Sequence, residues 1–473
     1  CASARVRSAI MRATMRRPLR AALLLPLFAA PPALAQEPEL PPPPTVEDPM
    51  LVPVPKARIE VATWEEALRH VRARSTDLRI ALQEVRRAEA QSRVALAGAL
   101  TTITGTAVYT HNLITNPTLQ FARGPDNSLT TRPVRTPFPD FVTGQVTASQ
   151  PVVALRAWYA IGTAELAEDV ARMTVEDVKR QIALNVANAI VGVVTAERVA
   201  ELNRVALRNA LARLELTVRK SALGGATGLD VVRSRQDVEV VRATLVAGDE
   251  TLRQAREALG LALGIPEQVG VPPTVDLDGL EASAKAACRP APRVEDRPDV
   301  AALRSRASVA RRAITDAKYQ YAPLVDLRSS ANTTTIDTGA APNTTWNVQA
   351  VLTVPIWDGG ARYGNLRDAQ AQERIALERL EAARRQATVE VTRARRAVEV
   401  AEQRAKVAGQ ALELADETDR LTRLAYVEGR GTSLELVTAA QQLREAQIQL
   451  ALREFELVNA RVAAVLALAT CPW

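Results

Sequence analysis

Histidine, cysteine and acidic side chains are the groups of this chain that could do chemistry, and the first two are scarce. The 473 residues include two histidines and three cysteines. His70 lies among arginines in a helical stretch, His111 ends a strand-like one, and neither has a second metal ligand spaced near it. Metal binding and nucleophilic catalysis both need such neighbours. We therefore expect no metal, no cofactor and no enzyme activity.

The acids that stand out follow two breaks that contain glycine. One break reads LGGATGLDVVRSRQ and the other, later in the chain, reads EGRGTSLELVTAAQ. Gly224 matches Gly429, and Asp230 matches Glu435. Each acid follows a threonine by three residues, the spacing of a capping box, in which the acid only stabilises a helix start. A second interpretation, which the residues leave open, adds a role in gating or in attracting cations.

Long helices must position these breaks. Uninterrupted helical patterns predict two long helices at 158–220 and 358–426, and shorter helices at 229–263 and 432–469 follow the breaks. About 63 residues at 1.5 Å each give roughly 95 Å of helix. Such length predicts a coiled coil or a helical barrel. The second long helix carries a heptad stripe of mostly small residues, namely Val391, Ala394, Val398, Ala401, Ala405, Ala408, Leu412 and Ala415.

Threonine-rich stretches interrupt the helical patterns at four places. They predict β-strands at about 102–112, 140–153, 323–337 and 344–357. Apolar and polar residues partly alternate along them. The stretch at 113–139 is rich in Pro, Asp, Asn and Gly and predicts a loop at a strand tip.

The two halves of the chain therefore follow one order: helix, strand, strand, long helix, tip, helix. The first of these helices is expected to run unbroken over 63–100. The expected parts are a first repeat at 63–264 with its tip at 221–229, a linker at 265–297, a second repeat at 298–469 with its tip at 426–433, and a tail at 470–473.

The N-terminal 35 residues predict a cleaved export signal. MRRPLR is a positive region, ALLLPLFAA a short apolar one, and ALA at 33–35 a cleavage site. Met11 and Met15 both remain candidate starts. The formal net charge of +7 falls to about +1 without this leader, and acids interleave with arginines elsewhere, so we expect no nucleic-acid partner. A proline-rich extended arm at 36–62 follows, and it is not expected to be helical.

Export would place the remaining cysteines, Cys288 and Cys471, in an oxidising compartment. A disulfide between them is one expectation, and two unpaired thiols are the other.

The strands suit a membrane only if several copies share them. Strands of about 10–13 residues can cross a bilayer, but an open sheet edge in hydrocarbon leaves backbone groups unpaired. Three copies would supply twelve strands and leave room for a water-filled lumen. A periplasmic coiled-coil scaffold, with the strands in a soluble subdomain, is the alternative from another class.

This order of elements resembles the TolC-type outer-membrane efflux proteins over about Trp64–Ala469. The strand exits QPV and VPIWDGG and the tip GRGTSLELVTAAQQLREAQIQLA carry the resemblance. It implies a homotrimer with a twelve-strand β-barrel in the outer-membrane lipid, continued by a twelve-helix α-barrel across the periplasm. It also implies a periplasmic adaptor (a membrane fusion protein) and an inner-membrane pump of the RND, ABC or MFS type.

The resemblance implies that the glycine breaks are periplasmic tips that close the tunnel at rest. It places one acidic gate position on Glu435 and a second on Thr438, which carries no charge. Asp230 takes the acidic position of the first tip. The basic latch position falls on Gly431, so Arg430 and Arg233 become the candidate latch residues.

The predicted function is an exit duct that passes small molecules from the pump to the exterior. A type I protein-secretion outlet of the same fold is the nearest alternative. The transported substrate is not predicted.

Overall fold

The computed structural model describes residues 45–123, 126, 128–273, 277–336, 342–471 and 473. The predicted export signal and the first part of the proline-rich arm, to residue 44, lie outside the described residues.

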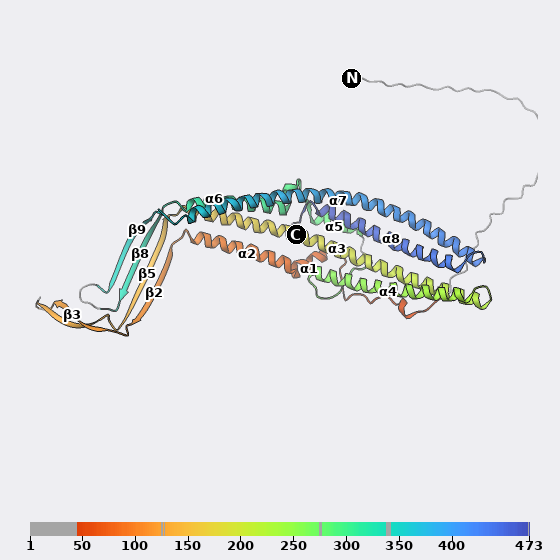
Figure 1. Cartoon of the computed structure of the whole chain (residues 1–473), viewed down its shortest axis with the longest axis horizontal. Helices are drawn as coiled ribbons and strands as arrows, with labels where there is room; N and C mark the ends of the chain where they lie inside the picture. Colours follow the sequence, from red (N-terminus) through yellow and green to blue (C-terminus); the bar gives the residue numbers. More distant parts are fainter. Residues whose placement is uncertain (1–44, 124–125, 127, 274–276, 337–341, 472) are drawn as a thin grey trace, which may run out of the picture. The chain divides into compact units, whose positions relative to one another are not determined.

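Long helices make up most of the described chain (Figure 1). α2 (Thr76–Ala97), α3 (Leu155–Ala222), α6 (Pro298–Tyr319) and α7 (Ala361–Val427) pack in that order, each against the next. α3 has 68 residues, which corresponds to roughly 100 Å at 1.5 Å per residue. The two longest helices, α3 and α7, each follow a strand at one end and reach a hairpin tip at the other.

The first helical stretch is two helices, so the expectation of one unbroken helix over 63–100 was wrong. α1 (Trp64–Arg74) ends where Ser75 adopts φ −58° and ψ 123°, outside the helical region. The Ser75 hydroxyl then accepts a hydrogen bond from the backbone N–H of Leu78 at 3.3 Å and caps α2. A serine that offers the backbone such a bond favours a break over a continuous helix.

Four strands form one antiparallel sheet in the order β2 (Thr102–His111), β5 (Asp140–Val153), β8 (Leu324–Thr334) and β9 (Thr344–Thr353). The sheet unites two strands from each half of the chain. The outer edges of β2 and β9 pair with no described strand.

The predicted loop at 113–139 is instead largely a second hairpin. β3 (Asn116–Arg123) pairs with β4 (Leu129–Thr136) along its whole length. Pro117 and Pro133 lie within these strands, and they are tolerated because a two-stranded ribbon consists only of edge strands.

The main hydrophobic core lies where the two halves meet. It combines residues of α1, α3, α4 (Gly228–Leu263), α8 (Ser433–Leu466) and α5 (Leu277–Ala287), a helix that lies within the linker. Two short strand pairs close this region: β1 (Ile59–Glu60) with β6 (Val269–Gly270), and β7 (Arg289–Pro290) with β10 (Ala469–Thr470). Cys288 and Cys471, each at most 1 % exposed, form a disulfide within it.

Arg297 ties this core together. Its guanidinium, only 4 % exposed, donates to Asp299 at 2.7 Å, to Glu390 at 3.0 Å and to the carbonyl of Ala467 at 3.2 Å. Burial alone would lower the pKa of Arg297, but the bonds to Asp299 and Glu390 outweigh it and raise the pKa above its usual value. The start of the second repeat is thereby fixed to α7 and to the end of α8.

The described part of the proline-rich arm lies along the α3–α4 hairpin. Met50 and Leu51 pack against a core cluster of α3 and α4, and Val54 packs against a second cluster. The arm is extended except for a three-residue 3-10 turn, η1 (Pro49–Leu51), so the expectation of an arm without any helical turn was wrong there. Asp48 caps that turn and forms an ion pair with Arg242 at 2.6 Å.

Candidate functional site

The four-stranded sheet has one apolar and one polar face. The strand register aligns large apolar side chains on one face, all of them exposed: Ile103, Tyr109, Val142, Val146, Leu327, Trp346, Val348 and Leu352. The opposite face is mostly polar and includes the exposed Val108; its polar residues are Thr104, Thr106, Thr143, Gln145, Thr147, Ser330, Asn332, Thr345, Asn347 and Gln349. An apolar face suits lipid and a polar face suits a water-filled lumen.

Both hairpin tips are built from the same two backbone devices. α3 ends in a Schellman motif, in which Gly224 has φ 77° and the N–H of Gly225 donates to the carbonyl of Lys220 at 2.8 Å. α7 ends the same way, with Gly429 at φ 78° and the N–H of Arg430 donating to Ala425 at 2.9 Å. Glycine is needed at both positive-φ positions because a Cβ atom is disfavoured there.

Each tip then restarts with a capping box. Thr227 caps α4, and the carboxylate of Asp230 accepts from the Thr227 N–H at 2.8 Å. Thr432 caps α8, and the carboxylate of Glu435 accepts from the Thr432 N–H at 2.8 Å. Both acids therefore cap helices.

Asp230 also joins the two tips. The Ser433 hydroxyl, at the start of α8, donates a hydrogen bond to the second carboxylate oxygen of Asp230. A second link lies alongside, where the ammonium of Lys220 donates to the carbonyl of Tyr426 at 2.6 Å and lies 4.1 Å from the centroid of its ring. Because these links connect α3–α4 to α7–α8, the two hairpins are tied together at their ends.

The hydrogen bonds at the tips set the charge of both acids. The bond from Ser433, followed by those from Thr227, lowers the pKa of Asp230, and burial opposes this only in part. The backbone N–H of Thr432 lowers the pKa of Glu435. Both carboxylates are therefore ionised at neutral pH.

The two basic residues named from the sequence lie apart from each other. Arg233 is 4.0 Å from Asp230, one turn along α4. Arg430 contacts Glu428 within its own tip, is 78 % exposed and forms no ion pair with Asp230 or Glu435 in the described residues. Gly431 is set against α7, where an added Cβ would lie 3.0 Å from the backbone nitrogen of Tyr426.

The residues that link the tips were missed by the sequence analysis. In the sequence, Lys220 is an ordinary basic residue in the last turn of a predicted helix, and Ser433 is the first residue after a predicted cap. No local pattern signals either contact, because the partners are more than 200 positions away along the chain.

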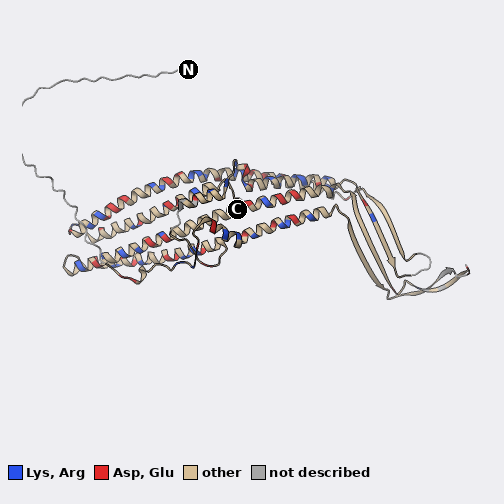
Figure 2. Cartoon of the chain, turned by 180° about the vertical axis from the view of Figure 1, so that it is seen from behind, with Lys and Arg blue, Asp and Glu red and all other residues tan. Residues whose placement is uncertain are grey.

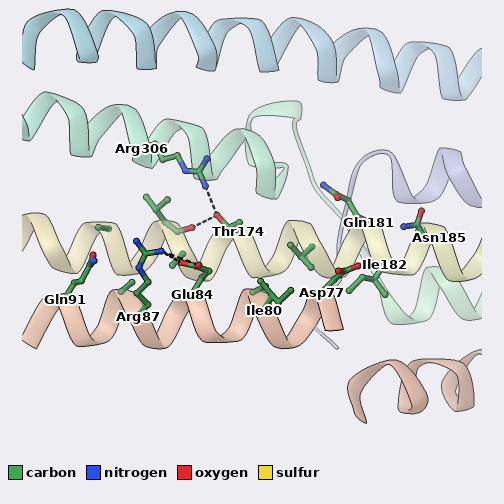
Figure 3. Close-up of a pocket in the computed structure, with 16 residues that line it drawn as sticks. Asp77, Ile80, Glu84, Arg87, Gln91, Thr174, Gln181, Ile182, Asn185 and Arg306 are labelled. Atoms are coloured by element: carbon green, nitrogen blue, oxygen red, sulfur yellow. Dashed lines mark hydrogen bonds and ion pairs between the residues drawn. The ribbon is translucent and has the colours of Figure 1, made fainter. Parts of the chain in front are cut away.

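A groove of about 650 Å³ lies between α2, α3 and α6 (Figure 3). Three of its charged side chains bind neighbours: Arg87 pairs with Glu84 at 3.0 Å, and Arg306 donates to Thr174 at 3.3 Å. Ile80 lines it and is 56 % exposed. The groove has the character of a packing surface beside the edge helix α2.

Known proteins share both sequence and fold with this chain. The toluene efflux pump outer membrane protein TtgC of Pseudomonas putida is 26 % identical over 274 residues, 56 % of each chain. The outer membrane protein OprJ of Pseudomonas aeruginosa is 26 % identical over 231 residues, 47 % of each chain. The chain thus spans about half the length of these curated relatives.

Solved structures match over more of the chain. CusC, whose structures concern transmembrane channel formation, superposes with a TM-score of 0.72 over 90 % of this chain and 99 % of its own, at 19 % identity. VceC of Vibrio cholerae superposes with a TM-score of 0.69 over 85 % of this chain and 95 % of its own, at 18 % identity. These matches confirm the predicted fold class of long helices continued by a small β part.

The family profile covers both halves of the chain and little of the linker between them. The description of that family is "Outer membrane efflux protein", and the match runs over residues 67–265 and 294–470. With the two-faced sheet, the long helices and the duplicated tips, this match makes the chain a member of the outer membrane efflux protein family.

Proposed function

We propose that three copies of this chain form the exit duct of an efflux system in the outer membrane. The observation that carries this proposal is the four-stranded sheet with an apolar face, a mostly polar face and two edges that pair with no strand of the described residues. A single copy cannot place such a sheet in lipid, because the backbone groups of β2 and β9 would lack partners.

Three copies are proposed because of the lumen that twelve strands would enclose. Two copies would give eight strands, and side chains would then fill the interior. Three copies give twelve strands and a water-filled channel, in keeping with the Thr, Ser, Asn and Gln side chains of the polar face. We further propose that α3–α4 and α7–α8 of the three copies continue this channel through the periplasm as twelve helical segments.

The tips would form the resting closure of the duct. Asp230, Ser433, Lys220 and Tyr426 tie the hairpins of one copy together, and separation of the hairpins would break both links. A periplasmic adaptor and an inner-membrane pump are the proposed partners that open the tips. Glu435, Arg430 and Arg233 are proposed to set the charge at this mouth, in addition to the caps that Asp230 and Glu435 provide.

Paired substitutions on the two faces of β5 test the pore. Val146→Arg places a charge on the apolar face, where arginine near the middle of a bilayer costs about 2–4 kcal/mol. Gln145→Arg places the same charge one residue away on the polar face. We expect Val146→Arg to abolish heat-modifiable trimers in the outer-membrane fraction and Gln145→Arg to preserve them.

Equal tolerance of both variants would contradict the proposed membrane face. Recovery of the unmodified protein as a soluble monomer would contradict the proposed duct and would favour the periplasmic scaffold.

A further inference from the structure

The strands of the sheet are almost free of charge. β2, β5, β8 and β9 contain three charged residues, Asp140, Asp326 and Arg328, and β2 and β9 contain none. Figure 2 shows these strands almost wholly in tan, beside helices densely banded in blue and red. A charge in such surroundings contributes strongly to the local field, because few other charges lie near it.

The register places Arg328 on the polar face. In the ladder Arg328 lies directly opposite Ser149 of β5 on one side and Gln349 of β9 on the other. Ser330, two residues along β8, shares its face and donates to Asn347 at 2.9 Å. Leu327, the preceding residue, is 45 % exposed on the apolar face. Alternation along the strand therefore fixes the two adjacent side chains on opposite sides.

Arg328 is also the accessible charge of the polar face. Asp326 shares that face but is 8 % exposed, and it lines a cavity of about 890 Å³ where the strands meet the helices. Arg328 is exposed, and it forms no ion pair with a described residue. Asp140 is far from both, at the opposite end of β5, where it accepts from Tyr109 at 2.7 Å.

We propose that Arg328 is a specificity-determining residue that makes the β-barrel section of the duct favour anionic over cationic solutes. This inference rests on the proposed function, since three copies are needed to close the lumen. Three guanidinium groups would then face one narrow water-filled section with low-dielectric walls, and rings of Arg or Lys favour anions in such pores. Solutes would meet the acids of the tips at one end and this cationic ring at the other.

Chemical labelling tests where the side chain lies. Arg328→Cys and Leu327→Cys are compared in outer membranes with a membrane-impermeant methanethiosulfonate reagent, and the parent protein, with Cys288 and Cys471 joined in the disulfide, serves as the blank. We expect rapid modification of Arg328→Cys and protection of Leu327→Cys by lipid. Protection of Arg328→Cys with modification of Leu327→Cys would overturn the inference and also the assigned faces of the sheet.

Reversal potentials in a KCl gradient across planar bilayers test the selectivity. Arg328→Gln should lower the chloride-to-potassium permeability ratio about two-fold or more near 0.1 M salt, with a much smaller effect near 1 M, where charges are screened. Arg328→Lys should preserve the ratio, and Gln349→Ala, a neutral change at the paired position, should leave it unchanged.

An unchanged ratio in an Arg328→Gln channel that conducts normally would overturn the role of Arg328 and leave the proposed duct intact. Absence of conductance in the unmodified protein would overturn the duct itself, and this inference with it.

Discussion

The two hairpins of this protein have similar tips but differ in how their two helices pack against each other. α3–α4 and α7–α8 both end in a Schellman glycine followed by a capping box. Along α3–α4, however, leucine and valine fill the interface, with Leu207, Val241 and Leu245 at most 1 % exposed. In α7 the mostly small-residue stripe forms the packed face: each of its members is buried or half-buried, with exposed residues between them.

The ion pairs within the first hairpin are also more deeply buried than those within the second. Three ion pairs join α3 to α4, and one partner of each is at most 7 % exposed: Arg204 with Asp249, Arg213 with Asp237, and Arg256 with Glu197. The pairs between α7 and α8, Arg461 with Glu402 and Arg404 with Glu456, have both partners at least 34 % exposed. Met50, Leu51 and Val54 of the N-terminal arm pack against α3–α4, and Asp48 pairs with Arg242 of α4. Within one copy, the first hairpin is therefore held more firmly than the second.

The largest effect should come from breaking a buried pair of the first hairpin. Arg204→Ala leaves Asp249 without its 2.5 Å partner in a largely buried position, and such losses cost about 3–5 kcal/mol. The matched change in the second hairpin, Glu402→Ala, removes an exposed pair and should cost less than about 1 kcal/mol. Urea unfolding of the detergent-solubilised protein measures both. Equal losses in the free energy of unfolding would contradict the difference between the two hairpins.

The arm provides the next largest effect. Asp48→Ala removes the cap of η1 and the ion pair with Arg242, and we expect a loss of about 1–2 kcal/mol. Hydrogen exchange should rise in α4 around Arg242 and stay unchanged in α8. A uniform rise in both hairpins, or none, would show that the arm does not distinguish them.

The arm contact should also depend on pH. The backbone N–H of Met50 and the Arg242 guanidinium lower the pKa of Asp48, against the effect of burial. A depressed carboxyl pKa stabilises the fold above the ordinary value of about 3.9, and this contribution is lost as pH falls through the folded-state pKa. The arm should therefore protect α4 equally from pH 8 to pH 5 and release it only in stronger acid.

The tips should respond alike to loss of their glycines. Gly224→Ala and Gly429→Ala each force a residue with a Cβ atom into the left-handed region, and each should lower the free energy of unfolding by about 1–2 kcal/mol. Gly228→Ala is the control, because that glycine lies in the first turn of α4 without a positive φ and with open space around it. Clearly unequal costs of the first two changes would show that the tips are not equivalent.

The smallest effects on stability should come from Asp230 and Glu435, and conductance should distinguish the two acids. Asp230→Asn and Glu435→Gln each weaken a cap, by about 1 kcal/mol or less, but only Asp230 also binds Ser433 across the hairpins. Single-channel conductance should therefore change with Asp230→Asn and with Ser433→Ala, and much less with Glu435→Gln. Because hydrogen bonds lower the pKa of both acids, conductance should not vary between pH 8 and pH 5. Conductance that is identical to that of the unmodified protein in all three variants would leave capping as the only role of Asp230 and Glu435.

The sequence was informative where a local pattern determines the structure. Helix periodicity, the glycine breaks and the capping-box spacing at Thr227 and Thr432 all act within a few residues, and the tips follow them closely. Alternation in β5 and β9 likewise indicated which side chains share a face of the sheet.

The remaining features depend on contacts between distant segments, which leave no local signal. The break at Ser75 arises from one side-chain bond inside a favourable helical pattern. The β3–β4 hairpin has prolines that argue against strands. The composition of the arm predicted an extended segment but not its packing against α3 and α4. The links of Lys220 and Ser433 exist only because two hairpins, far apart in sequence, end side by side.

The account depends above all on several copies sharing one sheet. Native mass spectrometry of the protein released from outer membranes in mild detergent measures this directly. We predict a complex of three mature chains that dissociates on heating. A monomer that stays folded and needs no detergent would contradict the account, because the edges of β2 and β9 would then require no partners.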